Sequence, residues 1–311
     1  MENDDGLGLE PSAPPEQDFT VSALGLVTRT LKVWVRKLPS YILIVGLIGV
    51  TFSLLQLAVF YALYGTLAFD LLIYVGADII NTLMGLFVTA PTAMAIEIII
   101  MAIVLTVVGM VVNAVLAGGG IKFALDDYGS HQADVGTSFS FAFSRLPTMI
   151  VAQFLLALIV SGASAPGTYF LFYALFSVDS SSLIMTLMAL PLTWIGLIVS
   201  LYFSIRLSPT SAVVVAEDLG AIDSMKKAWK LTTGNFWHIF GGQIPLVIAL
   251  VVIGLVVGML LFPLAFYGQA LVLYVSALIY SLLFGAISYV FAAVLYKDLE
   301  SRSGVVSQEF W

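Results

Sequence analysis

Six long apolar segments constrain this chain more than any other feature of its sequence. Each is long enough to cross the ~30 Å hydrocarbon core of a bilayer as a helix that rises ~1.5 Å per residue. Backbone polar groups in lipid must be paired within the protein, and uninterrupted runs of this length are typical of helices, whereas barrel strands alternate. The sequence therefore predicts an all-α fold, a polytopic transmembrane helical bundle with six spans. The six segments are residues 41–64, 93–116, 149–176, 183–205, 239–266 and 271–296.

The composition supports a lipid environment. Hydrophobic residues make up 60% of the chain and charged residues only 10%, whereas a soluble domain carries about 25% charged residues. A chain so poor in charge cannot cover its own surface in water, so lipid must cover much of it. The absence of cysteine excludes disulfides and thiolate metal sites. No cofactor, no metal site and no nucleic-acid partner are predicted.

The basic residues predict how the spans are oriented. In the six-span arrangement all twelve lysines and arginines fall on one side, and the opposite loops carry only Asp70, Asp78 and Asp179. Basic residues are enriched on the cytoplasmic side of membrane proteins. We therefore expect a multi-pass protein of the cell (plasma) membrane with both termini in the cytoplasm.

Polar ends flank the apolar part of the chain. Residues 1–18 hold six acidic residues and three prolines without an apolar run, which is typical of a disordered segment. We expect a disordered acidic cytoplasmic tail at 1–18, a single transmembrane domain at 19–298 and a cytoplasmic C-terminal tail at 299–311.

Residues 67–89 are also apolar and leave one alternative open. A carboxylate at the middle of a membrane costs about 2.5–3.5 kcal/mol on insertion scales, and this segment contains Asp70 and Asp78. That cost favours an interfacial or re-entrant helix pair on the outer face over a seventh span.

Three amphipathic stretches, each directly before a span, predict an internal repeat. In the first stretch Arg29, Lys32 and Arg36 share one helical face, and we expect the opposite, apolar face to insert into lipid. Residues 37–40 (KLPS) and 145–148 (RLPT) lead into two of the spans in the same way. The alternative is that positive-inside topology alone places basic stretches there. The repeat unit, an interfacial helix followed by two spans, would cover about 19–121, 134–208 and 219–298.

One segment carries a family resemblance. Residues 206–220 read RLSPTSAVVVAEDLG and lead into residues 221–237, AIDSMKKAWKLTTGNFW. This segment resembles the membrane domain that is fused to some glycerophosphodiester phosphodiesterases, and related stand-alone prokaryotic six-span membrane proteins of unknown function. Ala228 stands where that family commonly has a serine. The similarity is detailed over about 206–250 and topological elsewhere, and it implies a six-span bundle without a catalytic head.

The sequence contains no catalytic motif. It has no nucleophile elbow, no His-Glu-x-x-His zinc motif and no phosphate-binding or dinucleotide loop. We therefore expect a protein that is not an enzyme. An intramembrane enzyme acting on lipid headgroups would need facing acid–base groups. The only candidates for these are Asp126, Asp127 and His131, or Glu217 and Asp218 with His238.

Four polar residues inside predicted spans are candidates for function. Glu97 is an acid close to the outer end of its span, and Asn113, Gln153 and Gln243 are amides in three different spans. Interhelical hydrogen bonds, worth about 0.6–2 kcal/mol each, would explain the amides. A proton or cation site at Glu97 and a polar transport path along the amides are the alternatives.

Basic and aromatic residues at the cytoplasmic side are the main candidates for function. Each basic residue near an anionic leaflet contributes about 1 kcal/mol of attraction, although the same residues also serve to set topology. We expect a non-enzymatic, lipid-interacting scaffold or a subunit of a membrane complex, with membrane lipids, protein partners or further copies of the chain as partners. The alternative is a transporter or channel for a small or amphipathic, lipid-like solute. The interface candidates are Arg29, Lys32, Arg36, Arg145, Arg206, Lys226, Lys227, Lys230, Trp34, Trp229 and Trp237.

Overall fold

A computed structural model of the chain describes residues 19–64, 92–176, 182–263 and 269–309. Every regular element in these ranges is a helix, which confirms the predicted all-α class. Six of the helical stretches are long and apolar enough to cross a membrane, so the chain is a multi-pass membrane protein. These stretches are Leu38–Val59, Ile103–Ser130, Leu146–Phe170, Leu187–Glu217, Phe236–Leu261 and Tyr274–Ser303.

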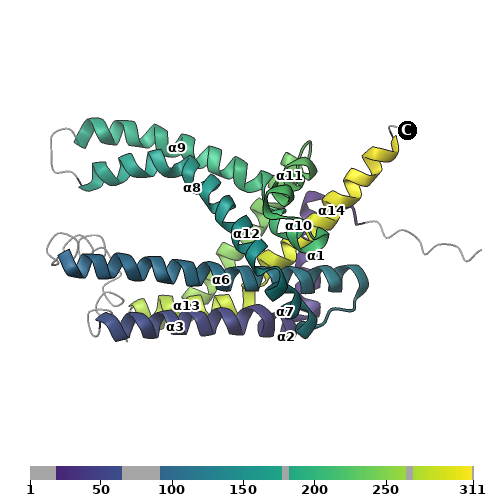
Figure 1. Ribbon diagram of the computed structural model, residues 1–311, viewed down its shortest axis with the longest axis horizontal. Coiled ribbons are helices and arrows are strands. Elements are labelled where there is room, and N and C mark those ends of the chain that lie inside the picture. Colours follow the sequence, from purple (N-terminus) through teal and green to yellow (C-terminus); the bar gives the residue numbers. More distant parts are fainter. Residues whose placement is uncertain (1–18, 65–91, 177–181, 264–268, 310–311) are drawn as a thin grey trace, which may run out of the picture.

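The long helices at 146–176 and 182–206 run alongside each other as a pair, and those at 47–64, 92–130 and 269–284 form a second group (Figure 1). The first span begins as α2 (Leu38–Tyr41), passes through one π-helical turn, η1 (Ile42–Gly46), and continues as α3 (Leu47–Tyr64). Proline at the second position of α2 needs no helical partner for its missing amide. The other long helices are α6 (Thr92–Ser130), α8 (Leu146–Phe176), α9 (Ser182–Arg206), α12 (Phe236–Leu261), α13 (Gln269–Phe284) and α14 (Ile287–Glu309).

Four shorter helices gather at one end of the bundle, on the right in Figure 1. Ser22 caps α1, because its hydroxyl accepts a hydrogen bond from the Gly25 amide at 3.0 Å. Asp134 caps α7 in the same way through the Thr137 amide at 2.8 Å. The four helices are α1 (Ala23–Arg36), α7 (Val135–Ser144), α10 (Thr210–Glu217) and α11 (Ala221–Leu231).

The sixth predicted segment, 271–296, is two helices instead of one. The chain leaves helical geometry at Gly285 and Ala286, and α14 then runs in a different direction from α13 (Figure 1). Just before this break the backbones of two spans touch: a Cβ added to Gly46 would lie 2.3 Å from the Leu282 carbonyl oxygen. The break falls at a glycine, the residue that, apart from proline, weakens a helix interior most, by about 1 kcal/mol. The predicted segment 271–296 reads as one continuous apolar run, so its sequence does not predict the break.

The end of α14 also differs from the expected tail boundary at 298/299. The helix continues through that position to Glu309, and Leu299 is fully buried. The first residues after 298 therefore belong to the packed helix. The predicted acidic tail 1–18 and the alternative for 67–89 lie outside the described residues.

One apolar face of α1 packs inside the protein, while two other apolar residues of the helix, Leu24 and Val35, are exposed, so the expected insertion into lipid stays a prediction. Leu26 and Val33 are buried, and α1 lies against α12 and α14. At Gly242 an added Cβ would come within 2.7 Å of the Leu26 side chain. Glycine on α12 thus lets the α1 helix approach closely.

Small residues also hold α8 and α9 together as a hairpin. A Cβ added to Gly167 would lie 2.5 Å from the Thr193 backbone, and Gly196 would meet Ser164 at 3.0 Å. The Ser200 hydroxyl donates to the Val160 carbonyl at 2.8 Å. Lipid-exposed helices commonly pack through such small residues, because van der Waals contact and interhelical hydrogen bonds drive their association.

Candidate functional site

The basic residues all lie on elements at one end of the bundle, which we call the basic end. It comprises α1, the last turns of α6, the α7–α8 junction, the end of α9, α11 and the second half of α14 (Figure 1). Seven of its twelve cations form ion pairs with carboxylates among the described residues. The five cations without such a pair are Arg29, Lys32, Lys37, Arg206 and Lys230.

Three acid–base pairs join the start of one span to the far end of the next. Arg36, just before α2, binds Asp127 near the end of α6 at 2.8 Å. Arg145, just before α8, binds Asp218 after α10. His238 in the first turn of α12 binds Asp298 on α14 at 2.8 Å. Of the three acids, the sequence offers Asp127 and Asp218, but not Asp298, as candidates for acid–base catalysis. In the structure each of the three links two helices, and we call these links ties. The predicted internal repeat remains a prediction, and this recurrence is consistent with it.

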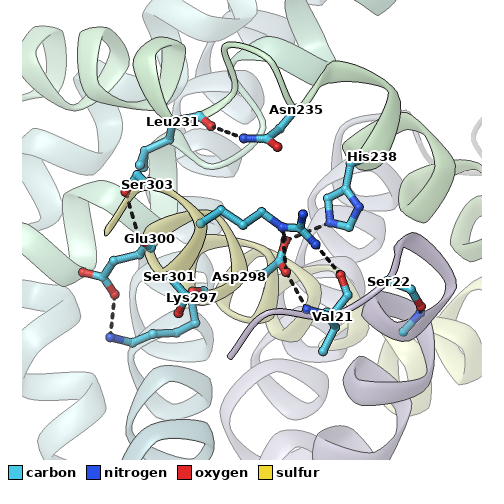
Figure 2. A network of polar contacts seen from close by, with 12 residues as sticks. Val21, Ser22, Leu231, Asn235, His238, Lys297, Asp298, Glu300, Ser301 and Ser303 are labelled. Carbon is cyan, nitrogen blue, oxygen red and sulfur yellow. Dashed lines mark hydrogen bonds and ion pairs between the residues drawn. The ribbon is translucent and has the colours of Figure 1, made fainter. Parts of the chain in front are cut away.

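Asp298 is the centre of the most extensive of these ties. Its carboxylate is fully buried and accepts hydrogen bonds from the Val21 amide at 2.8 Å and from His238 Nε2 at 2.8 Å. Arg302 donates to the same carboxylate from Nε at 3.0 Å and to the Val21 carbonyl from Nη2 at 2.5 Å. Figure 2 shows the carboxylate between the segment before α1 and the ring of His238. The start of α1 is thereby fixed to α12 and α14.

Arg206 is a buried cation whose described partners carry no negative charge. Only 7% of the residue is exposed. Its guanidinium carbon lies 4.2 Å from the centroid of the Trp229 ring, and its Nη2 donates to the Thr233 hydroxyl at 3.0 Å. Its Nε is buried without a hydrogen-bond partner among the described residues. A buried charge without an opposite charge is costly in a low-dielectric interior.

An open cavity of about 1230 Å³ lies between the segment before α1, α11, the loop that enters α12, and α14. Four cations and one acid, Asp223, line it. Thr233, the residue that binds Arg206, is part of its wall. We call this the α11 cavity. The cations that line it are Lys226, Lys227, Lys230 and Arg302.

A second cavity, of about 540 Å³, lies beside α1, and we call it the α1 cavity. Arg29, Lys32 and Arg36 line it together with His131. The structure thus sorts the predicted basic residues into two groups. Two of them join neither group: Arg145 is paired with Asp218, and Arg206 is buried behind Thr233. Sequence reasoning assigned Arg302 to the tail beyond the last span and so missed it as a cavity residue.

The three tryptophans among the predicted interface residues have different surroundings. Trp34 packs against Phe284, with ring centroids 5.6 Å apart, and Trp229 packs against Arg206. Both residues are partly buried against the protein, and their role as interface residues stays a prediction. Trp237 is 76% exposed, as a residue of an interfacial belt would be.

Two of the predicted intramembrane polar residues bind each other. Asn113 donates from Nδ2 to Gln153 Oε1 at 3.1 Å and accepts from the Tyr289 hydroxyl at 2.9 Å. Three spans, α6, α8 and α14, are tied by this group, which confirms interhelical hydrogen bonding for these two amides. Gln243 lies on α12 outside the group. Glu97 lies on α6, in a part whose side chains are outside the described residues.

The acids proposed for catalysis are occupied by other interactions. Asp126 pairs with Lys122 at 2.7 Å, and Glu217 pairs with Lys227 and accepts from the Tyr296 hydroxyl at 2.7 Å. Within the described part of the chain no group of three or more histidine, aspartate or glutamate side chains could hold a metal ion. No protein-family model, curated protein or solved structure matches the chain. The resemblance of residues 206–237 therefore stays a prediction.

Proposed function

We propose that this multi-pass membrane protein is a non-enzymatic, lipid-interacting scaffold or a subunit of a membrane complex. In this proposal the basic end faces the cytoplasm and binds the anionic headgroups of the inner leaflet of the cell membrane. The observation that carries the proposal is the set of exposed cations around the two cavities of the basic end, three of which, Arg29, Lys32 and Lys230, have no carboxylate partner among the described residues.

The arrangement suits headgroups because the cations are held where the spans end. Ties such as Arg36–Asp127 and His238–Asp298 fix α1 and the start of α12 to the bundle. The exposed cations on α1 and α11 therefore sit on anchored helices. Trp237, which is exposed and lies two residues after the cavity-lining Asn235, is typical of a residue at headgroup level.

The transport alternative has less support. Two of the amides considered for a polar path, Asn113 and Gln153, bind each other and Tyr289, so these contacts account for their polarity. An enzymatic role has less support because the acids considered for it are engaged in ion pairs with Arg36, Lys122 and Lys227.

Lipid retention tests the proposal. The full chain is reconstituted in nanodiscs that contain phosphatidylcholine and phosphatidylglycerol, and the lipids that remain bound after detergent extraction are counted by native mass spectrometry. We expect the wild type to retain phosphatidylglycerol preferentially. Neutralising Arg29, Lys32 and Lys230 to glutamine should weaken this preference by about 1 kcal/mol, or fivefold, for each residue.

A matched control removes an ion pair without a change in net charge. Lys122→Gln combined with Asp126→Asn, a pair at 2.7 Å on α6, should leave the preference unchanged. Equal retention of phosphatidylglycerol and phosphatidylcholine by the wild type would contradict the proposed function.

A further inference from the structure

We propose that the α11 cavity is a binding site for a single phosphate group, carried by the headgroup of an anionic phospholipid or by a free phosphorylated solute of the same chemistry. This proposal rests on the proposed function in its lipid form, because it assigns headgroup recognition to one cavity. It goes beyond general attraction to an anionic surface by naming the residues that bind one ligand.

The charges around the cavity favour an anion. Four cations and a single acid line it. Two of the cations are oriented by carboxylates outside the lining, Lys227 by Glu217 and Arg302 by Asp298. Arginine and lysine are the residues that most often bind phosphate, arginine through its fixed fork of donors and lysine as a compact charge.

Lys226 and Lys230 are the cations available to a ligand. They are four residues apart on α11, so both project from the same face of the helix. Lys226 is paired only with Asp223, at 3.2 Å, and both side chains are exposed, which makes this a weak pair. Lys230 is exposed and has no carboxylate partner among the described residues. A phosphate between them would gain two charge-assisted hydrogen bonds.

Arg206 supplies a second, independent reason to expect an anion here. This buried guanidinium binds Thr233, and Thr233 lines the cavity. The cation is therefore one hydrogen bond behind the cavity wall, with no carboxylate partner among the described residues to balance it. Coulomb attraction is screened less by buried surroundings than by water. An anion in the cavity would compensate Arg206 as well as the lysines.

The position of the cavity favours a lipid as the source of the phosphate. Thr233 and Asn235, which line it, directly precede α12, and α12 is a membrane span from Phe236 onward. The highly exposed Trp237 lies in the first turn of that span. The cavity wall is thus at the depth where the phosphates of a leaflet lie.

Two binding measurements on the full chain test the site. In the first, inorganic phosphate is titrated into nanodiscs of phosphatidylcholine alone and binding is followed by calorimetry. In the second, retention of phosphatidic acid from mixed nanodiscs is counted by native mass spectrometry. The test variant is Lys226→Gln with Lys230→Gln. The matched control is Arg29→Gln with Lys32→Gln, which removes the same charge from the α1 cavity of the same end.

We expect the Lys226/Lys230 variant to lower the affinity for the bound phosphate by at least about tenfold, because it removes two charge-assisted hydrogen bonds. The α1 variant, whose cations line another cavity, should lower the affinity for inorganic phosphate less than about threefold and should lose less phosphatidic acid than the Lys226/Lys230 variant. Lys226→Arg with Lys230→Arg should retain binding, which would show that the glutamine variant acts through charge and not through misfolding. Loss of both inorganic phosphate and phosphatidic acid supports a site that accepts either source, and loss of phosphatidic acid alone supports a lipid site. Loss of inorganic phosphate alone supports a solute site.

The outcome that overturns the site differs from the one that overturns the proposed function. If the two glutamine variants lose phosphatidic acid equally, and neither changes phosphate binding, the cavity is not a site and attraction to the whole basic end remains. If the wild type shows no preference for anionic lipid and binds no inorganic phosphate, the cavity proposal and the proposed function both fail.

Discussion

Asp298 and His238 are sixty positions apart in the chain and meet at 2.8 Å, which joins the first turn of α12 to the last helix, α14. The same carboxylate binds the backbone of Val21 and the guanidinium of Arg302. One fully buried acid therefore holds together three segments of the basic end. The α11 cavity is bounded by two of these segments, so its shape depends on this contact.

Asp298→Asn should destabilise the protein strongly. The substitution leaves His238 and Arg302 beside a neutral amide, and removing one partner of a buried charge pair typically costs about 3–5 kcal/mol. The apparent melting temperature in detergent is the measurement. Asp223→Asn is the control, because Asp223 is exposed and pairs only with Lys226, and it should change stability by less than about 0.5 kcal/mol. Equal effects of the two substitutions would contradict the account of this tie.

His238→Arg should preserve the tie. At the two other places where a span start is bound to the far end of the next span, the base is an arginine, Arg36 or Arg145. An arginine can therefore be expected to bind Asp298, whereas His238→Leu leaves that carboxylate one donor short, which costs about 1–3 kcal/mol. Thermal unfolding of both variants in the same detergent checks the order. A leucine variant as stable as the arginine variant would contradict the expectation.

Asn113 and Gln153 should show energetic coupling. Their side chains hydrogen-bond at 3.1 Å between α6 and α8. A double-mutant cycle with Asn113→Leu and Gln153→Leu, measured by unfolding in detergent, should give a coupling of about 0.6–2 kcal/mol. Additive effects would mean that this contact contributes nothing to stability. Asn113→Leu alone should cost more than Gln153→Leu, because it also leaves the Tyr289 hydroxyl without its acceptor.

Gly167→Ala should separate the α8–α9 hairpin. The added methyl would lie 2.5 Å from the Thr193 backbone, and overpacking of a close contact typically costs about 1–3 kcal/mol. Gly162, five residues earlier on α8, has no atom within 4 Å of an added Cβ. Gly162→Ala should therefore be neutral or slightly stabilising, because alanine favours helix over glycine by about 1 kcal/mol. Melting temperatures of the two variants that moved together would contradict the packing described for the hairpin.

The sequence predicts the number of spans well because length and apolarity alone decide whether a helix can cross a bilayer. It does not predict the break at Gly285, because other glycines, such as Gly118, Gly119 and Gly120, lie inside the unbroken helix α6. It also cannot tell which apolar residues of α1 pack inside the protein: Leu26 and Val33 are buried, whereas Leu24 and Val35 are exposed.

The candidate site could be predicted only in part. The lysines of α11 are visible as a basic stretch, and their clustering follows from helical spacing. Arg302 joins them across more than seventy residues of chain, through its tie to Asp298 and Val21. No sequence pattern within either segment predicts that contact. The buried state of Arg206 is also a tertiary property, because it depends on Trp229 of α11 and on Thr233 in the loop after α11.

Sidedness is the central claim of the account, since every argument about headgroups requires that the two cavities face the same compartment. The chain has no cysteine, so single cysteines at Lys32, in the α1 cavity, and at Lys226, in the α11 cavity, can be labelled without background. With a membrane-impermeant maleimide, we expect both positions to react in inside-out vesicles and to be protected in right-side-out vesicles. Labelling of the two positions from opposite sides of the membrane would contradict the account.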